Sequence, residues 1–152
     1  MQIYSMRLAL EPLPARLAAL RTTAELVRSL GRICDQMTQI TKRRDWAKLD
    51  RTDYEFHRTI VEASQHQRLI RAYEISHPRI LGRRADIARL KESPPDTTAQ
   101  KHARIVDRLE KGDAPGAEKA NYQHVERTMR AFQFSRGLVA MGAAFSQSKR
   151  RT

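Results

Sequence analysis

The sequence is poor in cysteine and in long apolar runs, and each shortage excludes a class of protein. Its single cysteine, Cys34, cannot form an internal disulfide, so we expect it to pack as a small apolar side chain in a reducing compartment. The longest apolar run, residues 137–145, is far shorter than the roughly 20 residues of a membrane-spanning helix. The N-terminus lacks the basic-then-apolar pattern of a secretory signal. These shortages predict a cytoplasmic protein without membrane contact.

The sequence also lacks the residue patterns of common enzyme sites. Its 6 glycines are dispersed along the chain rather than gathered in a phosphate-binding loop. It contains neither a Gly-x-Ser-x-Gly segment nor a cysteine-based metal motif. We therefore expect no nucleophilic catalysis.

Acidic residues are few in comparison with basic ones. The chain has 17 Asp and Glu against 29 Lys and Arg, a formal net charge of +12. The basic residues are spread over every segment, and no basic cluster is interleaved with aromatic side chains, which make up only 6% of the sequence. We interpret them mainly as solvated helix faces. The alternative is a basic helical module that binds nucleic acid through charge alone.

What the sequence has in abundance is helical periodicity. Apolar residues recur at steps of three and four, and no long stretch alternates with the period of a strand. At 152 residues the chain is long enough for one domain with a sizeable core. The pattern predicts a single all-α domain of six to seven helices, over residues 1–134, followed by a weakly ordered basic tail, 135–152. The expected helices cover about residues 3–20, 24–41, 46–63, 68–90, 98–110 and 114–132.

Two of these expected helices contain interruptions. Pro12 and Pro14 predict a kink or break near residues 11–14 of the first. Pro78 and Gly82 disturb the fourth. The apolar stripe of the first helix is expected to comprise Ile3, Met6, Leu10, Leu13, Leu17 and Leu20.

The third expected helix carries two ionisable residues on its apolar face. Asp53 and His57 are one turn apart and share that side with Leu49, Phe56 and Ile60. A buried carboxylate and a buried imidazole are costly unless they are paired or bind a metal. This conflict between position and chemistry points to a functional site.

His102 and His124 repeat the anomaly, because each interrupts the inward stripe of its own helix. Helix bundles build metal sites from side chains that project inward on facing helices. We therefore predict a divalent metal site formed by Asp53, His57, His102 and His124. Zinc is the first candidate, with nickel, manganese or iron as alternatives. Taken singly, each histidine is better explained as a hydrogen-bonded core or boundary residue than as a ligand, and only the joint pattern favours a metal.

Arg7, in the first helix, is a candidate partner for an anion bound beside the metal. The planar fork of a guanidinium matches the two oxygens of a carboxylate. An ion pair with Glu11, one turn further on, would explain Arg7 without any ligand. Both interpretations remain open at this stage.

Four stretches occur in an order and spacing that resemble a known family. They are residues 4–12, residues 49–64 with the Asp-x-x-Phe-His segment, residues 101–113 with a His-x-x-Ile segment and a Gly-Asp stop, and residues 117–124. They resemble the C-terminal effector-binding (FCD) domain of FadR-type regulators in the GntR family of transcription factors. The match covers about residues 3–132.

The resemblance implies an antiparallel all-α bundle that forms a homodimer and is not an enzyme. It implies that Asp53, His57, His102 and His124 bind a divalent metal, and that a small carboxylate effector beside the metal contacts Arg7. It also implies that DNA is bound only through an N-terminal winged helix-turn-helix, which this chain does not contain. The alternative to such a sensor is a metal-dependent hydrolase or oxygenase, because a site with open coordination positions can perform chemistry.

Overall fold

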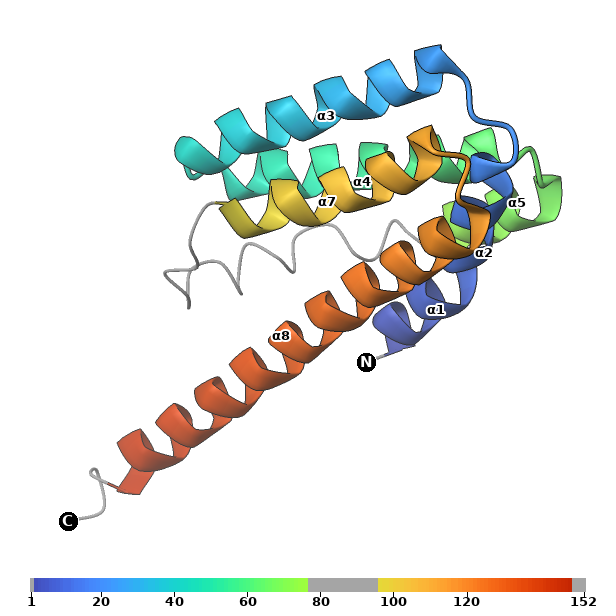
Figure 1. The fold of residues 1–152 in the computed structure, drawn as a ribbon. Coiled ribbons are helices and arrows are strands. Elements are labelled where there is room, and N and C mark those ends of the chain that lie inside the picture. The colour runs from blue at the N-terminus through green and yellow to red at the C-terminus, as the bar shows by residue number, and fades with distance from the viewer. Residues whose placement is uncertain (1, 77–95, 149–152) are drawn as a thin grey trace.

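A computed structural model describes the backbone of residues 2–76 and 96–148. These residues form helices only, and no strand occurs among them, which confirms the predicted all-α class (Figure 1). The helices are α1 (Gln2–Leu10), α2 (Pro12–Ala19), α3 (Ala24–Lys42), α4 (Trp46–Ala63), α5 (Gln67–Ser76), α7 (Asp96–Glu110) and α8 (Ala114–Ser148). None of the described helices is long and apolar enough to cross a membrane.

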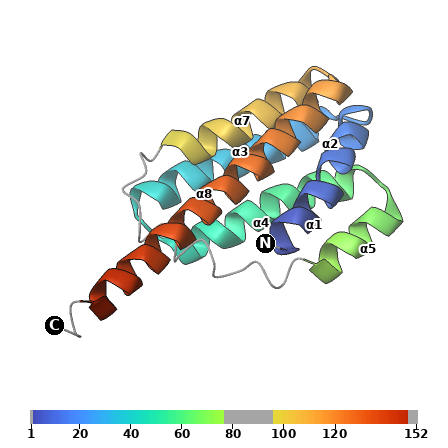
Figure 2. The same cartoon turned by 90° about the horizontal axis from the view of Figure 1, so that it is seen from below.

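The helices pack as a bundle in which α3 and α4 run antiparallel, as do α7 and α8 (Figure 1). α3 lies against both α4 and α7, α7 lies against α8, and α2 contacts α8 and α4 (Figures 1 and 2). The C-terminal half of α8 extends beyond the other helices in both views. α8 runs to Ser148, past its expected end near residue 132. The division of the chain at residue 134 stays a prediction.

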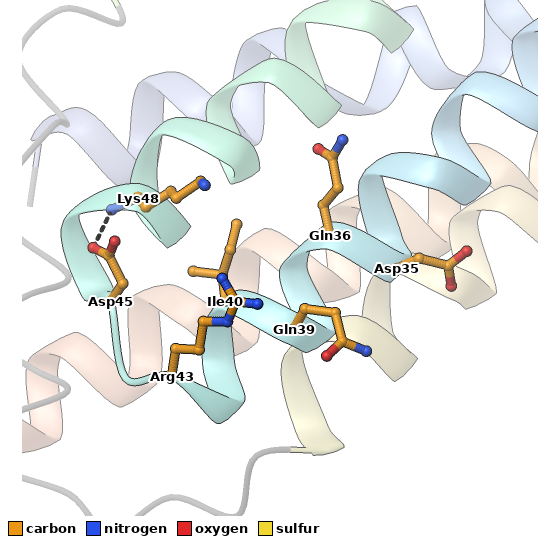
Figure 3. A pocket seen from close by; sticks show the side chains of 7 residues that line it. All are labelled: Asp35, Gln36, Gln39, Ile40, Arg43, Asp45 and Lys48. Carbon is orange, nitrogen blue, oxygen red and sulfur yellow. Dashed lines mark hydrogen bonds between the residues drawn. The ribbon is translucent and has the colours of Figure 1, made fainter.

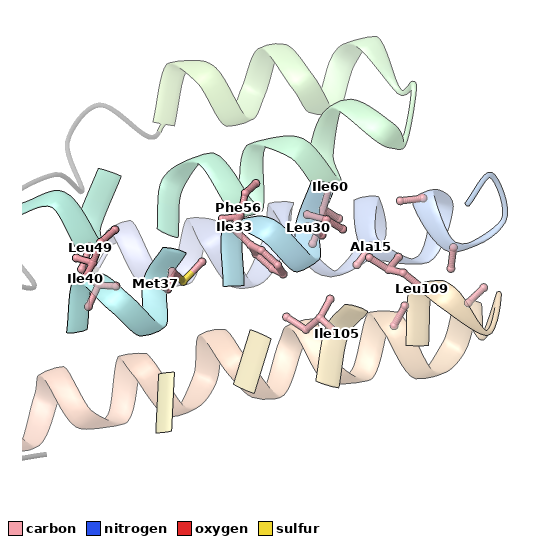
Figure 4. Close-up of a cluster of buried hydrophobic side chains, with 14 residues drawn as sticks. Ala15, Leu30, Ile33, Met37, Ile40, Leu49, Phe56, Ile60, Ile105 and Leu109 are labelled. Atoms are coloured by element: carbon pink, nitrogen blue, oxygen red, sulfur yellow. The ribbon is translucent and has the colours of Figure 1, made fainter. Parts of the chain in front are cut away.

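Side chains from α2, α3, α4, α7 and α8 form one hydrophobic core (Figure 4). The apolar face predicted for α4 is confirmed, because Leu49, Phe56 and Ile60 are buried. Leu30 and Met37 of α3 lie in the same core. Cys34 is partly buried and packs against this core, and burial, followed by the nearby Asp35 carboxylate, raises the pKa of its thiol to about 12. A thiol in that state is an inert packing residue.

The helix ends follow from short-range chemistry. Thr23 and Asp45 cap α3 and α4, accepting hydrogen bonds from the amides of Leu26 (3.1 Å) and Lys48 (3.0 Å). α7 ends at Glu110 and is followed closely by Gly112, whose φ of 62° lies in the left-handed region. The next amide, of Asp113, then donates back to the carbonyl oxygen of Arg108 at 2.9 Å, which closes the helix end.

The stripe predicted for the first segment is wrong. The segment breaks into α1 and α2 as expected, but Met6, Leu13 and Leu20 are 46%, 41% and 65% exposed. The buried face instead holds one aromatic residue, a charged pair, two prolines and three alanines: Tyr4, Arg7, Glu11, Pro12, Pro14, Ala15, Ala18 and Ala19. The alanines let α2 approach α8 and α4 closely, and the charges are buried because they pair with each other.

The fourth expected helix begins as α5 at Gln67. Its expected continuation to Leu90, with the disturbances at Pro78 and Gly82, lies outside the described residues.

Candidate metal centre

α4 places Asp53 and His57 side by side on its buried face. The helix is set by its Asp45 cap and is held against the core by Leu49, Phe56 and Ile60. The one-turn separation brings Asp53 Oδ2 to 3.8 Å from His57 Nε2. Both side chains are almost inaccessible to solvent.

α7 and α8 bring the other two predicted residues to the same place. His102 Nε2 lies 2.9 Å from Asp53 Oδ1, and His124 Nε2 lies 3.2 Å from His57 Nε2. The rings of His102 and His124 are 4.4 Å apart between centroids. Three helices therefore converge on one cluster, as the sequence predicted.

The geometry of this cluster fits a divalent cation. Each of the four residues offers one ligand atom, and these atoms lie within 4.8 Å of one another. Ligand atoms held about 2.1 Å from one ion lie roughly 3.0–3.4 Å apart at right-angle or tetrahedral positions, so only a small contraction is needed. Three imidazole nitrogens and a carboxylate oxygen are ligands that zinc and related divalent ions accept. The cluster is consistent with a metal site, and its occupancy and metal identity are proposals.

The surroundings of His124 favour its neutral imidazole. Burial, followed by the neighbouring His102 and His57, holds the pKa of His124 well below its ordinary value. A neutral ring is the form that binds a metal. Phe56 closes one side, with its ring edge-on to His102 at 4.6 Å between centroids and without any exposed surface.

Glu11 also contacts this site, which the sequence did not predict. Its Oε2 lies 3.0 Å from His57 Nδ1, on the side of the ring opposite the cluster. Arg7 donates from Nε to Glu11 Oε1 and from Nη2 to Oε2 (3.1 Å). Burial alone would raise the pKa of Glu11, but Arg7 and His57 outweigh it and lower that pKa to about 2. Burial likewise opposes the charge of Arg7, yet Glu11 raises its pKa above the ordinary value.

Arg7 therefore makes the ion pair that was the alternative to an anion contact. Its guanidinium is only 3% exposed and lies near enough to Asp53 for that carboxylate to raise its pKa further. The helical spacing of Arg7 and Glu11 was the available signal, but it does not reveal that His57 shares the same carboxylate.

Two more buried polar residues, Asn121 and Tyr73, were not predicted as functional. Asn121 lies one turn before His124 on α8, is 1% exposed, and its Oδ1 has no hydrogen-bond partner in the part of the chain that is described. Tyr73 of α5 is buried, and burial, then Glu11, raises the pKa of its phenol well above the ordinary value. Its ring stacks on Tyr54, 6.0 Å away between centroids. The polar position of Asn121 on the inward stripe was a usable signal.

The polar hollow beside α3 and α4 is a separate feature. It has a volume of about 420 Å³, and Figure 3 shows the side chains around it. They are Asp35, Gln36, Gln39, Ile40, Arg43, Asp45 and Lys48, and none of the four clustered residues is among them.

Comparison with known proteins places the chain in a class. Residues 2–127 match the model of the FCD domain. The chain thus belongs to the FCD domain family of GntR-type transcriptional regulators, which are not enzymes. This confirms the resemblance drawn from the sequence motifs, and it removes the hydrolase or oxygenase alternative.

Individual relatives agree with this assignment. The chain is 33% identical over 135 residues to a protein of Paenarthrobacter nicotinovorans described as a probable D-xylose utilization operon transcriptional repressor, covering 88% of this chain and 58% of that protein. A solved structure, Streptococcus agalactiae GntR, shares the fold with a TM-score of 0.69 at 20% identity, over 86% of this chain and 57% of that one. The chain thus spans less than three fifths of the length of each relative.

Proposed function

We propose that this chain is the sensing domain of a transcriptional regulator and that it binds a small organic acid at a divalent metal site. The observation that supports the proposal most strongly is the buried convergence of Asp53 and three histidines from three helices in an FCD domain. The proposed ligands are Asp53, His57, His102 and His124, and zinc is the preferred ion. A bound ion of higher coordination number would supply open positions for the oxygen atoms of the acid.

Arg7 is the proposed contact for the acid's carboxylate. Arg7 lies near enough to Asp53 for their charges to interact, so it places positive charge next to the cluster. This charge would offset the repulsion between the Asp53 carboxylate and a bound acid. The pair with Glu11 uses Nε and Nη2, which leaves the remaining N–H groups of the guanidinium for a ligand. The side-chain amide of the buried Asn121 is a second candidate contact, because its NH2 group can donate to a carboxylate.

The first experiment is metal analysis of the purified chain after reloading with zinc. We expect stoichiometric zinc in the wild type and its loss in Asp53→Ala and His102→Ala. Asp35→Ala and His66→Ala are matched controls, because these residues are exposed and lie outside the cluster. Wild-type protein that retains no metal would overturn the proposed site.

The second experiment addresses the acid. Thermal unfolding of the zinc-loaded chain is measured with a panel of small hydroxy acids, dicarboxylates, sugar acids and D-xylose, the last because of the operon that the Paenarthrobacter protein is described as repressing. At least one acid is expected to raise the Tm of the loaded wild type and to leave Asp53→Ala unchanged. An absence of any shift across the panel would count against acid sensing.

We propose that this domain is cytoplasmic and forms a homodimer in a full regulator. The dimer would control a DNA-binding winged helix-turn-helix, located in the part of the relatives that this chain does not cover. Exposed apolar side chains support self-association. Leu13 and Tyr122, 41% and 44% exposed, line a hollow of about 440 Å³ where α1 and α2 meet α8. Light scattering should give twice the chain mass, and Leu13→Glu should reduce it.

A further inference from the structure

Behind His57, on the face turned away from the metal cluster, lies the carboxylate of Glu11. Glu11 occupies the break between α1 and α2 and is 1% exposed. Its Oε2 is 3.0 Å from His57 Nδ1, while the other ring nitrogen, Nε2, is 3.2 Å from His124 Nε2. The imidazole therefore bridges a buried carboxylate and the cluster.

This arrangement fixes where the proton of a neutral His57 resides. An ionised carboxylate has no hydrogen to donate, so a neutral His57 can donate across this 3.0 Å contact only if its hydrogen is on Nδ1. Nε2 then carries the lone pair, and that lone pair points toward the cluster. The same contact restricts rotation of the ring, because a flipped imidazole would lose its acceptor.

Arg7 in turn holds Glu11 in place. It donates to both oxygens of the carboxylate, and the Oε2 that it reaches at 3.1 Å is the one beside His57. All three side chains are 3% exposed or less. A buried carboxylate remains charged only when it is paired, so Arg7 maintains the acceptor that His57 requires.

We propose that Glu11 and Arg7 are positioning residues for the metal centre: Glu11 selects the His57 tautomer that presents Nε2 to the ion, and Arg7 keeps Glu11 charged and oriented. This inference rests on the proposed metal site and extends it to α1. Carboxylates behind a ligating histidine raise its basicity and orient its ring.

The test compares zinc affinity in the wild type, Glu11→Gln and the double variant Arg7→Gln/Glu11→Gln, by competition with a chromophoric chelator. Glutamine keeps the size of Glu11 and removes the charge, and the double variant leaves no unpaired buried arginine. We expect zinc to bind about 10–100-fold more weakly in both variants. Glu118→Gln is the matched control, because it removes a carboxylate from an exposed ion pair with Arg16 and should bind zinc normally.

A second readout separates positioning from general stability. Long-range nitrogen–proton NMR spectra of the metal-free chain report which His57 nitrogen carries the proton. We expect Nδ1–H in the wild type and a mixture of tautomers in the folded double variant. If the variants bind zinc as tightly as the wild type and keep its tautomer, this inference is overturned. The Asp53→Ala variant would still test the metal site separately. Conversely, a wild type that binds no metal would refute the site, and the tautomer measurement would still decide the role of Glu11.

Discussion

His57 Nε2 and His124 Nε2 lie 3.2 Å apart although the two residues are separated by 67 positions in the chain. If His57 carries its proton on Nδ1, only the proton of His124 can fill this contact in the absence of a metal, which leaves His124 Nδ1 without a partner. A cation between the two nitrogens would take the place of that proton, because both rings could then present lone pairs to it. The contact therefore connects the fold of the chain to metal binding.

The first prediction concerns stability with and without metal. Zinc at 100 times its dissociation constant should stabilise the wild-type fold by about 2.7 kcal/mol, because only the folded chain assembles the four ligands. His124→Ala should lose this increment, and a chelator should bring the wild type back to its metal-free Tm. Thermal unfolding at fixed protein concentration measures both effects. A zinc-induced shift of equal size in His124→Ala would show that the ion acts elsewhere.

The second prediction concerns a core position of α3. Leu30 has no exposed surface and packs in the cluster that joins α2, α3, α4 and α7. Leu30→Ala should lower the free energy of unfolding by about 2–5 kcal/mol through lost burial and a residual cavity. Urea denaturation of the metal-free chain measures it. The exposed Leu20, replaced by alanine in parallel, should cost far less.

The third prediction concerns the backbone at Gln65, the residue after the C-cap of α4. Its φ of 55° lies in the left-handed region, where a side chain is strained and glycine is not. Gln65→Gly should raise the free energy of unfolding by up to about 1 kcal/mol, net of the greater freedom of the unfolded chain. Gly112→Ala, at φ 62°, should have the opposite effect. A loss of stability in Gln65→Gly would contradict the argument.

The fourth prediction concerns pH and the start of α8. Asp113 accepts a hydrogen bond from the amide of Gly116 at 2.9 Å, and this bond, followed by Arg108, lowers the pKa of its carboxyl below 3.8. A carboxyl with a lowered folded pKa adds stability above its unfolded pKa, and that contribution is lost as the pH falls through the folded value. Asp113→Asn should therefore be less stable than the wild type at pH 7, and the difference should shrink below about pH 4.

Urea titrations at stepwise pH values, down to the lowest pH at which the chain stays folded, measure the difference between the two proteins. Asparagine also caps helices well, so the comparison isolates the charge. A difference that stays constant with pH would show that the carboxyl does not titrate as argued. Gly116→Ala should remove the cap altogether, because a Cβ there would overlap the Asp113 carboxylate.

Residues that break an otherwise apolar helical stripe could be placed from the sequence alone. Asp53, His102 and His124 stand where periodicity demands apolar side chains, and each is buried as expected. The meeting of the three helices could not be derived from periodicity, which fixes the inward face of a helix but not its neighbours. The likeness to the FCD family supplied that step.

α1 and α2 show why apolar periodicity fails elsewhere. Apolar periodicity is judged mainly from large side chains such as leucine and methionine. Close packing of α2 instead buries the helix face that carries small alanine side chains. Periodicity also assigns charged residues to the exposed face of a helix. Arg7 and Glu11 are nevertheless buried, because each neutralises the other. The involvement of His57 with Glu11 depends on how two distant helices pack, so no local pattern contains it.

The four clustered residues come from α4, α7 and α8, so an ion bound to them would tie together segments that are far apart along the chain. Such an ion acts as a reversible cross-link: because it binds only the folded chain, its binding free energy adds to the stability of the fold. The lone Cys34 cannot provide a covalent bond of this kind. Metal exchange would then set how rigidly the three helices are joined, something that a permanent disulfide could not adjust.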